Sequence, residues 1–258
     1  GTRFAYADPK PYQQVVQIDI DPKEIGRNHK KTLSILGDAR QVLSQLLEAI
    51  KTKTKPKQNQ KITFDKMRSN RYENPANQVE PLASYVKALR RGMPDDAILV
   101  TDMTTIAYYS RTHYQTYNPR SYFTTSYSGN LGSAFPTSLG IKVARPNQAV
   151  VSISGDGGFL FNSQELATAI QFDINVVAIV FNDQSYSNVA RDMKEIFNNK
   201  FLGSELKNPN FMKLADAYGA VGMKAENPDV LKKSLKEAIA MNKTVLIEVP
   251  IGQMPSPF

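Results

Sequence analysis

The sequence predicts an α/β fold, a parallel sheet with helices on both faces, preceded by a partial α/β segment. From about residue 78 onward, apolar strand-like runs alternate with amphipathic helical stretches, which favours a parallel sheet. Runs such as "AVVSIS" and "NVVAIVFN" are almost continuously apolar, as is typical of strands buried on both faces. A Lys-rich polar stretch separates this region from a shorter segment before it.

The first 50 residues have the pattern of the end of an α/β unit. A strand is predicted over 15–20, followed by a turn at "DPKEIGRN". Apolar residues then recur at helical spacing from Val42 to Ile50, behind Asp38 as a plausible N-cap. One clear strand and one clear helix are too few to bury a sheet. We therefore interpret residues 1–50 as the C-terminal remnant of a larger domain.

Residues 51–77 are predicted to form a linker. The net charge of the chain is +8, and five lysines without any acid fall in "KTKTKPKQNQK": Lys51, Lys53, Lys55, Lys57 and Lys61. No aromatic residue interrupts this stretch, as a base-stacking surface would require. The composition favours a solvated linker. A nucleic-acid-binding arm is the alternative, and it rests on these lysines alone.

Residues 78–258 are predicted to form one domain in which helices and strands alternate. In a parallel sheet, ligands bind at the carboxyl ends of strands, so the residues to question are 102–105, 155–158 and 182–187. The predicted helices cover 79–93, 107–114, 135–144, 163–172, 210–219 and 228–241, and the predicted strands cover 97–102, 149–154, 175–182, 222–226 and 244–250. "MPSPF" at the end is either a plain tail or a lid.

Composition excludes several classes of site. The chain has no cysteine, which removes disulfides, thiolate metal sites and cysteine nucleophiles. No apolar run approaches the roughly 18 residues that span a membrane, and the N-terminal stretch lacks the apolar segment of a signal peptide. We expect a cytoplasmic protein that engages neither membrane nor nucleic acid. His113 and His29 are expected at structural or surface positions rather than in catalysis.

The stretch "SGDGG" carries the chemistry. Its glycines permit positive φ and a close backbone approach to a ligand, and a helix expected to start near Asn162 or Ser163 points its positive end there. Asp156 would repel a bare phosphate but suits a divalent cation that lies between them, because Mg²⁺ binds carboxylate and phosphate oxygens. Asp183 follows 27 residues later, at the end of the next predicted strand. This pattern predicts a metal–diphosphate site, and the alternative is that Asp156 is an ordinary turn residue.

The chain resembles the thiamine diphosphate-dependent enzymes, in the acetolactate synthase and pyruvate decarboxylase group. The spacing from "GDG" to the pair Asn182–Asp183 is similar to that family's thiamine diphosphate motif. "YSGNLGSAFPTSLGIKVARPNQAVVSISGDG" resembles the segment that leads into the motif, and "IDIDPKEIGRN" with "ILGDA" resembles the end of the central domain. "EVPIGQMPSPF" resembles the C-terminal end of some members.

The resemblance implies roles for individual residues. Asp156, Asp183 and the backbone carbonyl of Ser185 would hold Mg²⁺. The cofactor-binding residues would be Thr105, Gly129, Leu131, Gly155, Gly157, Gly158 and Tyr186. Among these, the Gly129 carbonyl would accept from the aminopyrimidine and Leu131 would bend the cofactor into a V. Asn188 and Val189 would lie on the substrate side of the next helix.

Two departures from the family pattern matter. Asp183 stands where the family usually has Asn, which preserves oxygen coordination and adds a negative charge. The family's essential Glu lies on an N-terminal domain that this chain does not contain, so the catalytic residue is unknown here. We expect either a fragment of a longer chain or a subunit whose partner supplies that Glu, with a homodimer or homotetramer as the assembly.

The expected function is that of a thiamine diphosphate- and Mg²⁺-dependent lyase or carboligase acting on 2-oxo acids, similar to acetolactate synthase. A simple 2-oxo acid decarboxylase of the same family is one alternative. A subunit that holds the cofactor without turnover is another, and the missing Glu is its main support. The polar side chain of Asn188 suggests a substrate unlike plain pyruvate.

Overall fold

In the computed structural model, the described residues are 10, 12–29, 32–53, 61–125 and 129–257, and the side chains of 61–63 are not described. The chain divides into two compact units, Gly1–Phe64 and Asp65–Phe258. Of the predicted linker, residues 54–60 lie outside the described residues, and with them Lys55 and Lys57. Within the described part, no helix is both long and apolar enough to cross a bilayer.

The N-terminal unit contains two strands and a helix. Strands β1 (Val15–Asp19) and β2 (Thr32–Leu36) pair in parallel, and helix α1 (Ala39–Lys53) follows. The Asp38 side chain accepts a hydrogen bond from the backbone N–H of Gln41 at 3.0 Å, as an N-cap does. Strand β2 was not predicted, because "TLSIL" is short and mixed in polarity.

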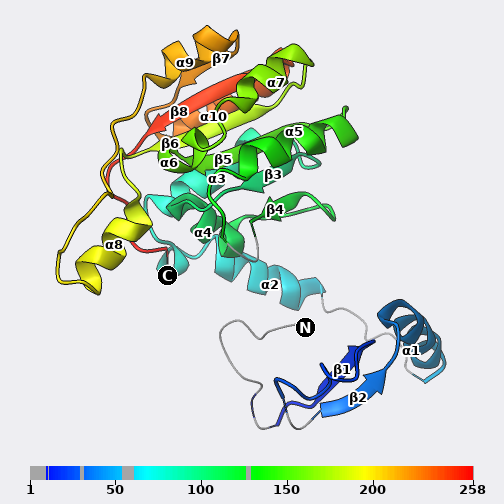
Figure 1. Ribbon diagram of the computed structural model, residues 1–258. Coiled ribbons are helices and arrows are strands. Elements are labelled where there is room, and N and C mark those ends of the chain that lie inside the picture. Colours follow the sequence, from blue (N-terminus) through cyan, green and yellow to red (C-terminus); the bar gives the residue numbers. More distant parts are fainter. Residues whose placement is uncertain (1–9, 11, 30–31, 54–60, 126–128, 258) are drawn as a thin grey trace. The chain divides into compact units, whose positions relative to one another are not determined.

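The second unit is built on a six-stranded sheet in the order β4-β3-β5-β6-β8-β7, with parallel pairing throughout (Figure 1). The strands are β3 (Ile98–Thr101), β4 (Tyr122–Thr124), β5 (Val150–Gly155), β6 (Val177–Asn182), β7 (Val221–Lys224) and β8 (Val245–Pro250). The chain runs from β3 out to β4 and returns to β5 on the other side of β3. Such a reversal of strand order opens a crevice at the carboxyl ends of the strands.

Helices cover both faces of this sheet, as the sequence predicts. Helices α3 (Leu82–Gly92), α4 (Thr105–His113) and α10 (Pro228–Met241) share one apolar core with alternate strand residues such as Leu99 and Ile153. Helices α5 (Ala134–Ala144), α7 (Glu165–Gln171) and α9 (Phe211–Tyr218) share a second core with the intervening strand residues. This alternation explains why the strands are apolar on both faces.

Several elements differ from the sequence prediction. Helix α2 (Lys61–Tyr72) lies inside the stretch that was predicted to be a linker, and edge strand β4 was not predicted. The helix predicted over 163–172 is present as α7 and starts at Glu165, but a further short helix, α6 (Asp156–Leu160), begins at the motif Asp itself and was not predicted. The glycines hid this start, because they disfavour helix by propensity. Helix α8 (Ser187–Glu195) follows strand β6 along the chain.

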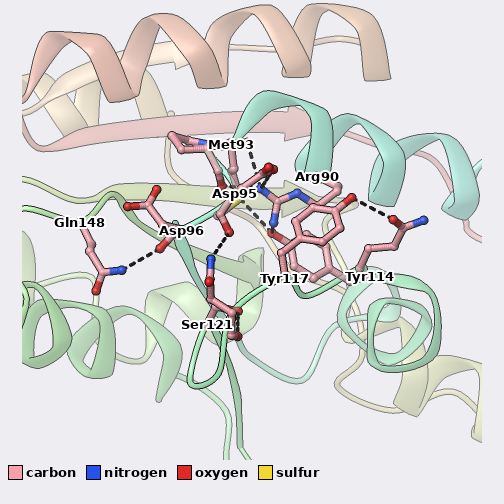
Figure 2. Close-up of polar contacts among 11 residues, drawn as sticks. Arg90, Met93, Asp95, Asp96, Tyr114, Tyr117, Ser121 and Gln148 are labelled. Carbon is pink, nitrogen blue, oxygen red and sulfur yellow. Dashed lines mark hydrogen bonds and ion pairs between the residues drawn. The ribbon is translucent and has the colours of Figure 1, made fainter. Parts of the chain in front are cut away.

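A buried arginine secures the sheet end opposite to the strand carboxyl ends. The Arg90 guanidinium donates to the Tyr114 hydroxyl at 3.0 Å and to the Met93 carbonyl at 3.0 Å, and it lies 5.1 Å from the ring centroid of Tyr117 (Figure 2). Gln148 donates to the Asp96 carbonyl at 2.9 Å in the same region. The Arg90 contacts tie α3 to the segments that enter β3 and β4, and the Gln148 contact ties the segments that enter β3 and β5 to each other. His113 stacks on Tyr109 at 3.9 Å between centroids, a structural position.

Candidate functional site

A cavity of about 290 Å³ opens at the carboxyl ends of the central strands. It brings together every residue that the sequence singled out for cofactor, metal or substrate, from segments up to 84 positions apart (189 − 105). The predicted residues lining it are Thr105, Gly129, Leu131, Gly155, Asp156, Gly157, Gly158, Asp183, Ser185, Tyr186, Asn188 and Val189. Their individual roles as ligands remain predictions.

The glycines are where close approach requires them. A Cβ at Gly157 would lie 2.3 Å from Tyr186 Cε1, and a Cβ at Gly158 would lie 2.9 Å from Asp102 Oδ2. Gly129 has a φ of +63°, which a residue with a Cβ seldom adopts. The backbone at the first turn of α6 therefore packs closely against Tyr186 and Asp102, and Gly157 and Gly158 line the cavity there.

Three aspartates follow directly after three adjacent strands: Asp102 after β3, Asp156 after β5 and Asp183 after β6. Burial raises the pKa of all three carboxyl groups. The neighbouring charge of Asp156 further raises the pKa of Asp183, so these two carboxylates repel each other. Among the described residues, neither forms an ion pair with a basic side chain.

Hydrogen bonds position the two carboxylates in different ways. Asp183 Oδ2 accepts from the Ser187 hydroxyl at the start of α8. Asp156 is 1% exposed, and its Oδ2 accepts from Asn208 Nδ2 at 2.5 Å. The chain around 204–206 runs beside the Ser185–Tyr186 segment, with the Tyr186 N–H donating to the Ser204 carbonyl at 2.8 Å. Both carboxylates are thus held at the cavity by partners from outside the motif.

The substrate-side residues lie at the first turn of α8. The Thr105 hydroxyl on α4 is 3.4 Å from Asn188 Oδ1, so these two predicted residues meet across the cavity. Val189 is 49% exposed. Ile251 lines the same cavity just after β8, and its N–H donates to the Asn182 carbonyl at 2.9 Å.

Sequence reasoning placed Asp102 among the residues to question without giving it a role, and it missed Asn208 altogether. Asp102 is fully buried, and its carboxylate accepts from the Gly132 N–H at 2.8 Å and the Met103 N–H at 2.9 Å, which fixes the turn that carries Leu131. Its place directly after a strand was a usable signal. Asn208 had none, because it lies in an irregular segment that only the tertiary fold brings to Asp156.

The donor set fits a divalent cation bound with a diphosphate. Two mutually repelling carboxylates without a cationic partner would be stabilised by Mg²⁺ bound between them. Within the described chain no group of three or more His, Cys, Asp or Glu gathers around one point. The protein would therefore supply Asp156, Asp183 and the Ser185 carbonyl, and phosphate and water would fill the other positions.

Comparison with known families identifies the protein family of this chain. The model of the thiamine pyrophosphate enzyme C-terminal TPP binding domain matches residues 102–249, and that of the central domain of the same enzymes matches residues 1–46. The chain belongs to the thiamine pyrophosphate enzyme family. The match over 102–249 contains every predicted site residue, and the match over 1–46 agrees with the resemblance of the N-terminal segment to a central domain.

Relatives in this family include acetolactate synthases. The chain is 33% identical over 252 residues to a probable acetolactate synthase large subunit of Methanocaldococcus jannaschii, covering 93% of this chain and 42% of the relative. It is 29% identical to acetolactate synthase isozyme 3 large subunit of Escherichia coli (93% and 44%) and 28% identical to sulfoacetaldehyde acetyltransferase of Castellaniella defragrans (92% and 44%). The chain thus spans less than half the length of these relatives.

A solved structure shares the fold. Benzoylformate decarboxylase from Polynucleobacter necessarius matches with a TM-score of 0.73 at 23% identity, covering 96% of this chain and 46% of that one. This likeness confirms the α/β architecture with its parallel sheet.

Proposed function

We propose that the chain carries the diphosphate- and metal-binding half of a thiamine diphosphate- and Mg²⁺-dependent lyase or carboligase that acts on 2-oxo acids, in the manner of acetolactate synthase. One observation carries this proposal: the buried Asp156 and the half-buried Asp183 stand at the ends of adjacent strands, at the start of α6 and without a cation partner among the described residues. The names of the most similar relatives support the choice of acetolactate synthase-like chemistry.

In this proposal each residue has a physical task. Asp156, Asp183 and the Ser185 carbonyl would hold Mg²⁺, and the backbone of Gly157 and Gly158 would bind the diphosphate. Leu131 and the Gly129 carbonyl would orient the pyrimidine half from the turn that Asp102 fixes. Bound thiamine diphosphate would supply an electron sink for the carbon–carbon bond that is broken in a 2-oxo acid. Asn188 and Val189 would contact the substrate.

Two alternatives remain within the family. A simple 2-oxo acid decarboxylase would use the same residues, and the shared fold with a benzoylformate decarboxylase is compatible with it. A subunit that holds the cofactor without turnover is the second alternative. In either case we propose a homodimer or homotetramer, because the site would be completed by another domain.

The test is calorimetric titration with thiamine diphosphate, with and without Mg²⁺. Asp156→Ala should weaken Mg²⁺-dependent binding by more than the roughly 10–100-fold lost when a residue that only supports a ligand is changed. Asp183→Asn should have a much milder effect, because an amide oxygen can still coordinate. Asp216→Ala, an exposed carboxylate on α9, is the matched control and should bind like the parent. Unchanged binding in Asp156→Ala would refute the proposed site.

A further inference from the structure

We propose that Asn208 is a positioning residue for the metal-binding carboxylate of Asp156, kept in one orientation by a chain of hydrogen bonds that starts at Glu248. This inference rests on the proposed function, because it concerns the carboxylate that would hold Mg²⁺. Asn208 is not part of the SGDGG motif, because it lies 52 residues after Asp156.

The chain of hydrogen bonds crosses the ends of three adjacent strands. Asn182 Nδ2, at the end of β6, donates to Glu248 Oε1 on β8 at 2.7 Å. Asn208 Nδ2 donates to Asn182 Oδ1 at 2.8 Å and to Asp156 Oδ2, just after β5, at 2.5 Å. The sequence of contacts is therefore Glu248, Asn182, Asn208 and Asp156.

Donor and acceptor chemistry allows this chain only one polarity. A carboxylate can only accept, so Glu248 requires the NH₂ group of Asn182. The oxygen of Asn182 then faces Asn208, and the Gln184 N–H also donates to that oxygen at 3.2 Å. Asn208 must present its NH₂ group to two acceptors, because its oxygen would otherwise face two oxygens.

The remaining oxygen of Asn208 shows how strongly that orientation is imposed. Asn208 Oδ1 is buried and has no hydrogen-bond partner in the described structure. A buried acceptor without a partner is unfavourable, and turning the amide would place it against Asp156 instead. The orientation that places the NH₂ group on Asp156 therefore leaves the Asn208 oxygen without a hydrogen bond.

The consequence for the metal site is geometric. Asn208 holds Oδ2 of Asp156, and the backbone N–H of Gly157 also donates to this carboxylate, so its rotation is restricted. Partners that orient a metal ligand in this way typically contribute 10–100-fold to metal affinity. Asn208 would therefore raise the affinity for the cation without touching it.

The experiment measures metal binding directly. Mn²⁺, which also prefers oxygen ligands, is titrated into the full chain in the presence of thiamine diphosphate, and free Mn²⁺ is followed by its paramagnetic resonance signal. Asn208→Ala should raise the Kd for Mn²⁺ by about 10–100-fold. Asn147→Ala, an exposed Asn on the turn before β5, is the control and should match the parent.

Three further variants separate positioning from a general structural role. Glu248→Gln can still present an oxygen to Asn182, so its Kd for Mn²⁺ should stay close to that of the parent, whereas Glu248→Leu should raise it. Asn208→Asp places a third carboxylate beside Asp156, so the metal-free Tm should fall and Mn²⁺ should restore it. If Asn208→Ala does not fold, the pair of Glu248 variants carries the test.

The outcomes are distinguishable. If the parent binds Mn²⁺ in a diphosphate-dependent way and Asn208→Ala binds it equally well, the positioning role is overturned and the proposed function stands. A lower Tm without any change in the Kd for Mn²⁺ would also overturn it, since that is what a purely structural residue produces. If the parent itself shows no such binding, the proposed function fails together with this inference.

Discussion

Replacing Gly157 by Ala tests whether the motif needs the space of a missing side chain. A Cβ there would lie 2.3 Å from Tyr186 Cε1 and 3.0 Å from Leu206 Cδ1. Ordinary contact begins at 3.4 Å, so the ring or α6 must move by about 1.1 Å (3.4 − 2.3). The ring is rigid, and the Tyr186 N–H donates a hydrogen bond to the Ser204 carbonyl, so the shift costs free energy.

Two opposing effects set the size of the change. Overpacking of this kind costs about 1–3 kcal/mol, and Gly→Ala in a helix gains at most about 1 kcal/mol. The gain is at its low end here, because α6 has only five residues and Gly157 is in its first turn. We expect a net loss of about 1–2 kcal/mol in the free energy of unfolding. Thiamine diphosphate should also bind more weakly, because Tyr186 lines the cavity and its displaced ring would occupy part of it.

The control is Gly140→Ala. Gly140 lies inside α5, and a Cβ there would meet nothing within 4 Å. The same chemical change should therefore stabilise the protein by about 0.5–1 kcal/mol. Urea unfolding of both variants gives the two free energies, and calorimetric titration with thiamine diphosphate and Mg²⁺ gives the affinity. If Gly157→Ala were as stable as the parent and bound the cofactor equally well, the steric reasoning would be wrong.

Three further predictions concern pH, activity and assembly. Burial raises the pKa of Asp102 above 3.8, so the folded chain holds a proton that the unfolded chain releases, and stability falls as pH rises through that window. Asp102→Asn should therefore gain stability relative to the parent as pH rises from 3.8, and a pH-independent difference in urea unfolding would contradict this. The 258-residue chain alone should show no turnover of pyruvate with cofactor and Mg²⁺, because it lacks the family's Glu; robust release of CO₂ would refute this. The complete protein should be an oligomer, with 129–135 near the contact, although Ala134 and Phe135 themselves pack into the domain's own core; a strict monomer by light scattering would oppose this.

The alternation of strands and helices could be predicted because it depends on local patterns. Continuous apolar runs mark strands buried on both faces, and helical spacing marks the helices that cover them. The site could be located for a related reason: in a parallel sheet the carboxyl ends of strands meet at one edge, so Asp156 and Asp183 had to come close. The resemblance to a known family then supplied Gly129, Leu131 and the remaining predicted residues.

The sequence did not reveal elements whose stability comes from neighbours rather than from their own residues. Strand β4 has only three residues, yet it forms an edge because β3 offers an open row of hydrogen-bonding groups. Helix α6 begins at Asp156 despite two glycines, and these positions need glycine because a Cβ would meet Tyr186 or Asp102. Local propensity favours the opposite choice at these glycines, and packing overrides it.

The sequence by itself therefore determined the fold class, the edge of the sheet that binds ligands, and the carboxylates that face the proposed metal. Only the tertiary structure decided which groups hold those carboxylates in place. Asn208 lies in an irregular segment, and Glu248 on β8 is linked to Asp156 only through Asn182 and Asn208. Hydrogen bonds depend on distances of a few tenths of an ångström between segments far apart in the chain, and residue order alone does not specify such distances.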